Sequence, residues 1–380
     1  MTSIPIIKAP LSVNERKLLN IIRQNGVMPR HKIVTGMDIT VQAIGQITKR
    51  LDHYKLLIHH KAVKVGLGQP PKPISINPDN VFSIGIKVGR RHTELMLVDL
   101  VGAVRERHSI TYAFPVTQDL LPQIGRHLGR IQLELEQQDK QLIGIGVAAP
   151  FALGGWHKLL GLSDAQADEW NSLNLVAAIQ DMTPRPVKLV KDTAAACIAE
   201  MLNGQGKICN NFLYIFVDTF VGGSVVANAQ WFATTNGNSG AVASLPMRGA
   251  IPKDQLLNNA SLWELEQLFR SEGLEPSAAY DNRALAASHA TLTAKWLDTA
   301  SRSLAFAIVS GAAFLDTDAV VLDGSMAPDL LSQLICRTEN ALADFNWQGI
   351  WQPKLLKGLI GSDAGALGGA LLPLHEYFYA

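Results

Sequence analysis

The sequence has few cysteines and no long apolar run. Its 380 residues include three cysteines, Cys197, Cys209 and Cys336, and their spacing fits neither a disulfide framework nor a cysteine zinc site. No run approaches the roughly 18 apolar residues of a membrane span, and residues 1–10 lack the apolar core of a signal peptide. These absences argue against a disulfide-stabilised secreted protein and against a membrane protein, so we expect a cytoplasmic one.

The bulk composition is that of a folded chain. Hydrophobic residues make up 47% of the sequence and charged residues 18%, which is typical of globular proteins and not of disordered ones. Since domains commonly contain about 100–200 residues, the length predicts two or three compact units.

The net charge of +1 conceals two oppositely charged parts. Residues 1–73 carry twelve Lys or Arg against three Asp or Glu, a net +9, and the remainder carries 22 against 30, a net −8. A basic segment beside an acidic body is the electrostatic pattern of a nucleic-acid-binding module. The alternative is a solvated basic surface, but confinement of the charge to one patterned segment favours DNA binding.

Residues 11–75 have the pattern of a winged helix-turn-helix. The predicted helices run from Ser12 or Asn14 to about Gln24, from Arg30 to Val34, and, after a turn at residues 36–38, from Thr40 to His53. Thr40 is the predicted N-cap of the third helix. Val41, Ile44, Thr48 and Leu51 follow the helical period and predict its packed face.

The opposite face of this third helix carries the side chains that a DNA-recognition helix needs. Gln pairs with adenine through two hydrogen bonds, and Lys or Arg binds guanine or phosphate. We therefore predict that Gln42 and Gln46 contact bases and that Lys49 and Arg50 contact phosphates, with Thr40 also near the DNA. Solvated helix residues with no DNA contact are the alternative.

Two short alternating segments follow and predict a wing. They are Leu57–His60 and Val63–Val65, with Lys61 near the tip, and Lys61 and Lys64 are further predicted DNA contacts. Residues 66–71 form either a groove-contacting arm or a linker. The Pro-rich stretch up to Pro78 is expected to be a semi-rigid spacer.

The rest of the chain alternates apolar strand patterns with helical ones. Strands are predicted at 81–89, 93–99, 143–150, 187–190, 212–217, 223–227 and 319–325, and helices at 193–202, across much of 261–315, and from 361 onward. Mixed strands and helices in two successive sets predict an α/β fold with two lobes and a cleft between them.

Five stretches of the sequence resemble the conserved motifs of a known protein family. They are Lys87–Arg91, Val190–Ala194, Asp218–Ser224, Gly240–Ser244 and the Gly/Ala-rich Gly361–Ala370. In order and spacing they resemble the motifs of the ROK family (repressors, open reading frames and kinases), in its DNA-binding branch, over residues 11–380. The resemblance implies a winged helix-turn-helix domain at 1–75, an actin-like, ribonuclease H-like lobe at 76–190 joined by a C-terminal helix at about 362–380, and a second lobe at 191–361, with an effector in the cleft.

Both phosphate loops of the family are altered here. Arg90 and Arg91 replace the Gly and Thr of the first loop, and Asp218 and Phe220 replace glycines of the second. Glycines allow backbone N–H groups to approach phosphates, and an acid beside a triphosphate is repulsive. We therefore expect neither kinase activity nor a nucleotide cofactor. Arg90 and Arg91 either attract anions or are solvated turn residues.

The sugar-binding motifs are also altered. Asp192 matches the family's catalytic Asp and is expected to be vestigial, while Lys191 replaces its Asn neighbour and either pairs with Asp192 or contacts a ligand. In the sugar clamp, Ala241 and Ser244 replace Glu and His, and residues 248–263 contain no Cys, so no structural zinc is expected.

These features together predict a transcriptional regulator, a repressor, and not an enzyme. It would bind double-stranded operator DNA as a homo-oligomer, a dimer or a tetramer, and respond to a carbohydrate, a polyol or a phosphosugar. The expected effector contacts are Pro150, Phe151, Asn171, Lys191, Asp192, Gly222, Gly240 and Ser244. Two alternatives stay open: an active sugar kinase with an appended DNA-binding domain, and a DNA-binding protein controlled by a partner without a small ligand.

Overall fold

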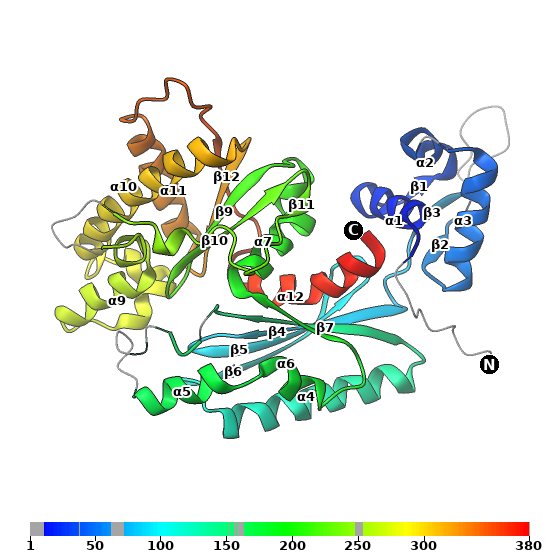
Figure 1. Ribbon diagram of the computed structural model, residues 1–380, viewed down its shortest axis with the longest axis horizontal. Coiled ribbons are helices and arrows are strands. Elements are labelled where there is room, and N and C mark those ends of the chain that lie inside the picture. The colour runs from blue at the N-terminus through cyan, green and yellow to red at the C-terminus, as the bar shows by residue number, and fades with distance from the viewer. Residues whose placement is uncertain are drawn as a thin grey trace. The chain divides into compact units, whose positions relative to one another are not determined.

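The computed structural model describes residues 11–37, 39–61, 72–151, 153–155, 157, 163–247 and 254–379. The chain divides into two compact units (Figure 1). Unit one contains Met1–Val190 together with Ala366–Ala380, and unit two contains Lys191–Gly365. In the described part of the chain, no helix has the length and apolar character needed to cross a membrane.

The N-terminal part of unit one is a small helical domain with an antiparallel sheet. Its elements are α1 (Val13–Asn25), β1 (Met28–Pro29), α2 (Arg30–Met37), α3 (Val41–His53), β2 (Leu57–His59) and β3 (Pro73–Ile76), and the strand order is β1-β3-β2. Its core includes the fully buried Leu18, Leu19, Ile33 and Leu51. This is the arrangement expected of a winged helix-turn-helix.

The strand that pairs with β2 is not the one that the sequence predicted. β2 pairs with Pro73–Ile76, the stretch that we expected to be a spacer, and Leu57 lies opposite Ile76. Ile74 and Ile76 are buried on one face of this strand, and proline is tolerated at the first position of a strand. Val63–Val65, the expected second strand of the wing, lies outside the described residues.

The second helix is longer than expected. α2 continues through Met37, so Gly36 and Met37 are helical and not part of a turn. Ile33 and Met37, four residues apart, are both buried, and this spacing places them on the same side of the helix. Asp38 lies outside the described residues.

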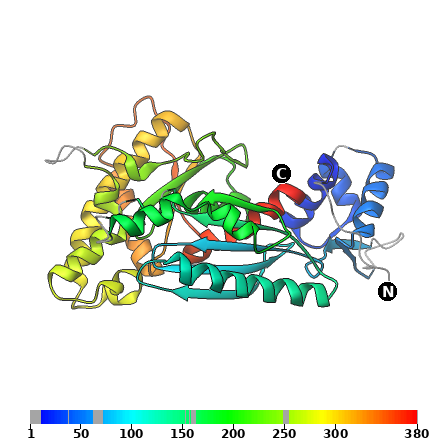
Figure 2. The ribbon, with the colours of Figure 1, turned by 60° about the horizontal axis from the view of Figure 1, so that its bottom comes forward.

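The larger part of unit one is a five-stranded sheet with helices on its faces. The strands, in the order β6-β5-β4-β7-β8, are β4 (Val81–Val88), β5 (His92–Asp99), β6 (Val104–Thr111), β7 (Gln141–Ala149) and β8 (Val187–Lys191). The helices α4 (Thr117–Gln137), α5 (Asp164–Ser172) and α6 (Leu175–Gln180) cover one face of this sheet, below it in Figure 1 and in front of it in Figure 2. α4 packs on the sheet through Leu120, Ile124, Leu128, Ile131 and Leu135, a regular helical stripe.

The last helix, α12 (Ala364–Leu374), lies very close to the strands of unit one. A Cβ atom on Gly85 would come within 1.9 Å of the Ala366 carbonyl oxygen, and one on Gly146 within 1.9 Å of the Gly369 carbonyl oxygen. Only glycine therefore fits at these two strand positions. The glycines of the late Gly/Ala-rich segment and of β4 and β7 serve close packing of the helix on the sheet.

The C-terminal turn, a short π-helix at His375–Tyr379, attaches the helix-turn-helix domain to the rest of unit one. The Leu11 N–H donates to the Tyr377 carbonyl at 3.2 Å, and the Arg23 guanidinium lies 5.1 Å from the ring centre of Tyr379. The Tyr379 hydroxyl donates in turn to the Leu100 carbonyl. Figure 1 shows the chain's C-terminus beside α1.

Unit two is built on a second five-stranded sheet, in the order β11-β10-β9-β12-β13. Its strands are β9 (Phe212–Val217), β10 (Val221–Ala227), β11 (Gln230–Trp231), β12 (Ala319–Gly324) and β13 (Lys354–Lys357). Its helices are α7 (Asp192–Asn203), α8 (Leu257–Ala260), α9 (Leu262–Ser271), α10 (Ala290–Leu315) and α11 (Pro328–Leu342). Short 3-10 turns lie at Gln205–Lys207, Val242–Ser244, Pro276–Tyr280, Asn282–Leu285 and Gly361–Asp363. Phe269, Trp296, Leu304 and Leu330 lie in one apolar core between these helices and the sheet.

Candidate functional site

The third helix, α3, presents a polar face as predicted from its sequence. The Thr40 side chain accepts a hydrogen bond from the Ala43 N–H at 3.2 Å and so caps the helix. Ile44, Ile47, Thr48 and Leu51 are buried, while Gln42, Gln46, Lys49 and Arg50 are exposed. Val41, which we expected on the packed face, is 74% exposed and lies ahead of the buried stripe. The exposed face of α3 is free of packing against the domain core and has the side chains to enter a DNA groove. Its DNA contacts stay predictions.

A buried carboxylate holds one of the predicted DNA contacts. The Glu15 side chain is 1% exposed, and its Oε1 lies 3.0 Å from Nε of Arg50, whose side chain is 65% exposed. The other oxygen of Glu15 accepts hydrogen bonds from the backbone N–H and the hydroxyl of Ser12. Glu15 thus caps α1 and also fixes the Arg50 guanidinium on α3, which we expected only to contact phosphate.

The wing begins with a well-anchored strand. The His59 ring lies 2.8 Å from an Asp52 carboxylate oxygen, and the His60 ring lies 2.8 Å from the Ser75 hydroxyl. Lys61 follows directly and is exposed. Lys64 lies outside the described residues.

In unit two, Lys191 has a defined set of contacts. Its ammonium donates to the Asn238 side-chain oxygen at 2.8 Å and to the Gly223 carbonyl at 3.3 Å. Burial lowers the pKa of Lys191, and the neighbouring Asp192 charge opposes this. Asp192 itself accepts a hydrogen bond from the Thr193 N–H at 2.7 Å. Sequence reasoning missed Asn238 because it lies far along the chain.

Two of the predicted effector contacts are glycines that the packing requires. A Cβ atom on Gly222 would come within 2.6 Å of Cγ2 of Thr193. Gly240 has a positive φ of +67°, and a Cβ there would lie 2.7 Å from Cα of Ser224. Ser244, at the position of the family's His, is exposed in a 3-10 turn. Whether these residues touch a ligand stays a prediction.

The segment Asp218–Ser224, which matches the family's second phosphate loop, is hydrogen-bonded to the start of α9. The N–H groups of Leu262 and Trp263, at the start of α9, donate to the carbonyls of Asp218 and Thr219. The Val221 N–H donates to the Ser261 hydroxyl at 3.0 Å. Backbone N–H groups at a helix start are the usual ligands of phosphate, and here they are bonded to the protein.

Two buried acids hold the segment that leads to α12. A Glu200 carboxylate oxygen accepts from the Leu359 N–H at 3.1 Å, and an Asp323 oxygen accepts from the Gly361 N–H at 3.1 Å and from the Tyr214 hydroxyl at 3.0 Å. Burial raises the pKa of both acids. Asp323 therefore serves the packing of unit two, a role that the sequence did not suggest.

In unit one, the predicted effector residues lie on two segments. Phe151 is exposed and follows the half-exposed Pro150 at the end of β7, and Asn171 is exposed on α5. Trp170, the neighbour of Asn171, is buried and donates its Nε1–H to the Pro115 carbonyl at 2.7 Å. Effector contact by Pro150, Phe151 and Asn171 stays a prediction.

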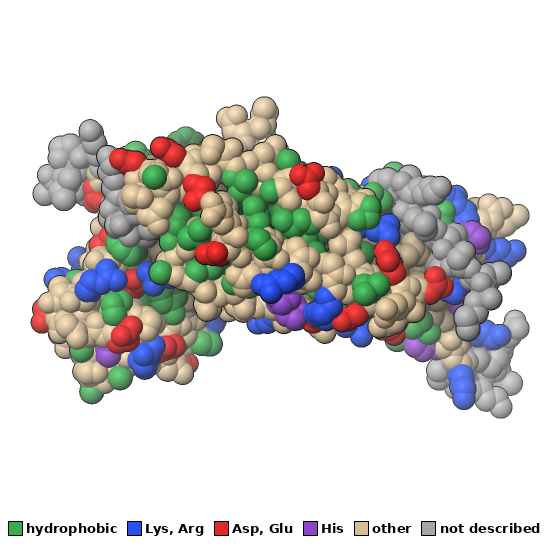
Figure 3. Space-filling view, turned by 90° about the horizontal axis from the view of Figure 1, so that it is seen from below, with side chains coloured by type: hydrophobic (Ala, Val, Ile, Leu, Met, Phe, Trp, Pro, Cys, Tyr) green, Lys and Arg blue, Asp and Glu red, His purple; other side chains and the backbone are tan. Residues whose placement is uncertain are grey.

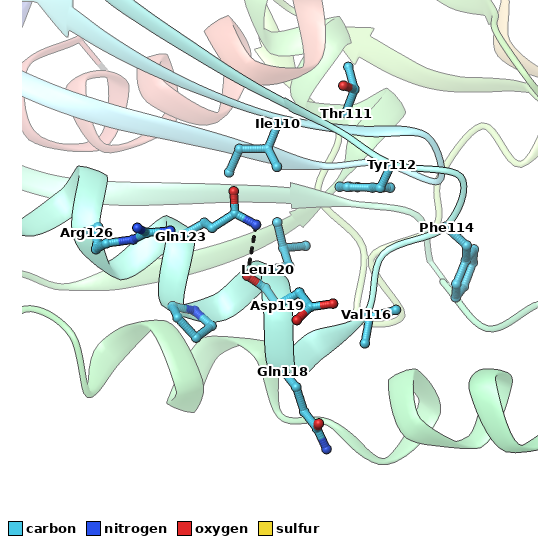
Figure 4. A pocket seen from close by; sticks show the side chains of 11 residues that line it. Ile110, Thr111, Tyr112, Phe114, Val116, Gln118, Asp119, Leu120, Gln123 and Arg126 are labelled. Carbon is cyan, nitrogen blue, oxygen red and sulfur yellow. Dashed lines mark hydrogen bonds between the residues drawn. The ribbon is translucent and has the colours of Figure 1, made fainter.

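Unit one also has a hollow that the sequence gave no reason to expect. A cavity of about 540 Å³ opens between the end of β6 and the first half of α4. Figure 4 shows Tyr112, Leu120, Asp119 and Arg126 among its lining side chains. Figure 3 shows the face of unit one from below, where apolar side chains are exposed between charged ones.

Within the described residues, no three His, Cys, Asp or Glu side chains form a group suited to a metal ion.

The ROK family profile matches residues 83–376. This chain belongs to the ROK family. Among its ROK relatives, the xylose repressor of Bacillus subtilis (strain 168) is 23% identical over 256 residues, which cover 67% of this chain and 65% of the repressor.

Solved ROK structures show the fold. A ROK family transcriptional regulator, a homologue of the E. coli MLC protein, has a TM-score of 0.69 at 18% identity and covers 96% of both chains. The ROK hexokinase from Thermus thermophilus has a TM-score of 0.57 at 19% identity and covers 76% of this chain and 97% of the hexokinase. The predicted fold class is confirmed: an N-terminal winged helix-turn-helix is followed by an actin-like α/β body. Because the relatives include repressors and kinases, membership alone does not decide the activity.

Proposed function

We propose that this chain is a transcriptional repressor that binds operator DNA through α3 and the wing and responds to a small ligand. One observation carries the proposal. α3 is capped by Thr40, packs through one stripe, and exposes Gln42, Gln46 and Lys49 on the other side. A helix of this kind fits the major groove of DNA, where Gln and Lys recognise bases and phosphates. The net +9 of residues 1–73 supports it.

Within the DNA-binding face, we assign a double role to Arg50. Its Nε contacts the buried Glu15 carboxylate, and most of the side chain stays exposed. A guanidinium presents several N–H groups in a fixed plane, so an Arg held on one side by a carboxylate can offer the other side to a phosphate.

The effector that we propose is a carbohydrate, a polyol or a phosphosugar. Lys191, Asp192, Gly222, Gly240 and Ser244 of unit two are its proposed contacts. The hydrogen-bonded pair of Lys191 and Asn238 offers a donor and an acceptor to sugar hydroxyls, and the charge of Lys191 favours an anionic group such as phosphate. Effector binding would lower operator affinity by favouring a different conformation of the protein.

We propose that the protein acts in the cytoplasm and has no kinase activity. The N–H groups of Leu262 and Trp263 are bonded to the loop that would have to hold phosphate, and Asp218 adds a negative charge there. The retained Asp192 favours the alternative, a sugar kinase. Phosphate transfer from ATP to any sugar of a broad panel, abolished by Asp192→Asn, would overturn our assignment.

Selection of bound sequences from a random duplex library tests the DNA-binding half of the proposal. We expect a two-fold-symmetric sequence with half-sites about 34 Å apart, as two helix-turn-helix domains require. Recovery of unrelated sequences at the frequency of the starting library would contradict it.

Thermal unfolding in the presence of sugars, polyols and their phosphates tests the effector half. A ligand at 100 times its Kd adds about 2.7 kcal/mol of stability, and we expect that Lys191→Met abolishes the effect. If no compound stabilises the protein while specific DNA binding persists, control by a protein partner replaces control by a small ligand.

A further inference from the structure

The cavity of unit one lies between an edge strand and a helix, and we call it the β6–α4 groove (Figure 4). β6 is the last strand in the order of its sheet and, in the described part of the chain, has a neighbouring strand on one side only. From α4, the groove is lined by Asp119, Gln123 and Arg126. Their spacing of four and three residues places them on one flank of the helix, beside its buried stripe.

The next residue on this flank shows that the flank faces β6. Arg130 follows Arg126 by four residues, and its guanidinium contacts the Glu106 carboxylate and the His108 ring of β6. The strand and the helix are thus held together at Arg130, and toward the start of α4 they leave the cavity of about 540 Å³ between them. A volume of this size is within the range of small-molecule binding sites.

The edge of β6 offers backbone groups for hydrogen bonding. The Tyr112 N–H, just after β6, donates to the Arg91 carbonyl at 3.0 Å, on the side of β5. In an antiparallel pair, successive residues direct their N–H and C=O groups to opposite sides of the strand. The backbone groups of Ser109 and Thr111 are therefore directed away from β5, and Thr111 lines the groove. A free strand edge of this kind can bind an extended peptide as an additional strand.

Two opposite charges in the groove have no partner among the described residues. The side chains of Asp119 and Arg126 form neither an ion pair nor a hydrogen bond with any of them. The two residues are seven positions apart on one flank, which is about 10.5 Å along the helix axis at 1.5 Å per residue. An extended chain covers about this distance with three residues.

The spacing of these charges and the rest of the lining favour a peptide over simpler ligands. A free amino acid carries its ammonium and carboxylate on the same carbon and is too short to reach both Asp119 and Arg126. A ligand of one charge sign would leave one of the two without a counter-charge. The groove is also lined by a mixture of apolar and polar side chains, which suits a peptide: Ile110, Phe114, Val116 and Leu120, with Thr111, Gln118 and Gln123.

We propose that the β6–α4 groove binds a free tripeptide in extended form, with its ammonium at Asp119 and its carboxylate at Arg126. Asp119 lies near the end of β6, because a short segment joins that end to the start of α4, and Arg126 lies nearer to Arg130 and its contacts on β6. The peptide therefore runs antiparallel to β6. None of the proposed effector contacts lines the groove, so the inference is separate from the proposed function.

Isothermal titration calorimetry of the full chain with the tripeptide alanyl-leucyl-alanine, without DNA, tests the proposal. We expect a dissociation constant of about 1 mM or lower. The N-acetylated and the C-amidated forms of the tripeptide each lack one charge, and each should bind about tenfold or more weakly, the effect of losing a hydrogen bond between charged groups. No binding of the free tripeptide at about 10 mM would overturn the proposal.

Two variants assign each end of the peptide to its partner. Asp119→Asn should weaken binding of the free tripeptide about tenfold or more and leave binding of the N-acetylated form unchanged, and Arg126→Gln should do the same with the C-amidated form. Glu136→Gln is the matched control, since Glu136 is an exposed acid of α4 that does not line the groove, and it should change no constant. Equal effects of Asp119→Asn on the free and the acetylated peptide would contradict the assignment.

Thr111→Pro tests whether the peptide is added to the edge of β6. Proline removes the N–H that is directed away from β5, and edge strands tolerate it at such positions. We expect this variant to bind the tripeptide about fivefold or more weakly, through the loss of one hydrogen bond, and to keep its fold in circular dichroism melting. Full binding by the folded variant would overturn the strand-addition geometry, and if the variant does not fold, Asp119→Asn and Arg126→Gln decide the proposal. Because no DNA is present, operator binding is a separate result that bears only on the proposed function.

Discussion

The proposed recognition helix α3 and the proposed effector-binding loops of unit two use their polar groups in opposite ways. On α3, Gln42, Gln46 and Lys49 are exposed, and the helix is held from behind by its buried stripe. In unit two, the carbonyls of the Asp218 loop and the ammonium of Lys191 are hydrogen-bonded to neighbouring parts of the protein. Polar groups that point outward can bind another molecule at little cost, whereas those already bonded must first be released. The comparison therefore favours the exposed face of α3 as the surface for our proposed DNA recognition.

The largest expected effect comes from removing the base-reading groups of α3. In the Gln42→Ala, Gln46→Ala double variant, we expect specific operator affinity to fall by about 2–6 kcal/mol, since each two-bonded base contact is worth about 1–3 kcal/mol. Non-specific affinity, which depends on phosphate contacts, should stay the same. Fluorescence anisotropy with operator and scrambled duplexes measures both. An unchanged ratio of the two affinities would show that these glutamines do not read bases.

The next effect concerns the attachment of the N-terminal domain to the body. Burial, followed by the charges of Arg23 and Arg16, lowers the pKa of His375 from its usual 6.5 to about 4. The folded protein therefore keeps His375 neutral while the unfolded chain takes up a proton as the pH falls from 6.5 to 4. Over this window we expect the free energy of unfolding to fall by up to roughly 3 kcal/mol on account of this residue, with the contribution complete above pH 6.5.

Urea unfolding of the wild type and of His375→Gln at pH 7, 5 and 4 measures this contribution. The variant lacks the titrating group, so its stability should fall less than that of the wild type as the medium is acidified. Parallel curves for the two proteins would mean that His375 takes up its proton equally in the folded and unfolded chains.

A smaller effect is expected from the pair of Glu15 and Arg50. If Arg50 is held by Glu15 and also binds phosphate, Arg50→Lys should lose about 1–2 kcal/mol of operator affinity, because a single ammonium cannot serve both contacts in the same geometry. Glu15→Gln should lose part of the same affinity, and the double variant should lose no more than Arg50→Lys alone. Additive losses in this cycle would show that the two side chains act separately.

The smallest effect is expected for Lys49. Its replacement tests whether the exposed face of α3 contacts DNA phosphates. Lys49→Ala should weaken binding to all DNA sequences alike and reduce the slope of log K against log salt by about one unit. Lys191→Ala, in unit two, should leave the slope unchanged. Equal slopes for Lys49→Ala and the wild type would remove Lys49 from the phosphate contacts.

Sequence reasoning identified the strands with uniformly buried side chains and one edge strand, β8, but missed the edge strands β6 and β13. The run at 212–217 predicted β9 because all of its residues are apolar and buried. β6 was missed because alternate residues of this edge strand are exposed and charged, among them Arg105 and Arg107. β13 was missed for a related reason, since it is only Lys354–Lys357 and lies at the other sheet's edge.

For the candidate sites, the sequence predicted features that follow from a local pattern and missed contacts between distant residues. The exposed face of α3 could be predicted, because the helical period alone separates Gln42 and Gln46 from Ile44 and Leu51. The contacts of Glu15 with Arg50 and of Lys191 with Asn238 could not, since each joins residues that are distant in the chain and only the tertiary fold brings them together.

The most direct test of the central assignment is a gel shift of the purified protein on the intergenic DNA that flanks its own gene, with and without sugars, polyols and their phosphates. We predict a specific complex at moderate salt that one class of compound releases. Absence of any specific complex at moderate salt would contradict the assignment of α3 as a recognition helix and direct the search toward an enzymatic activity of the actin-like body.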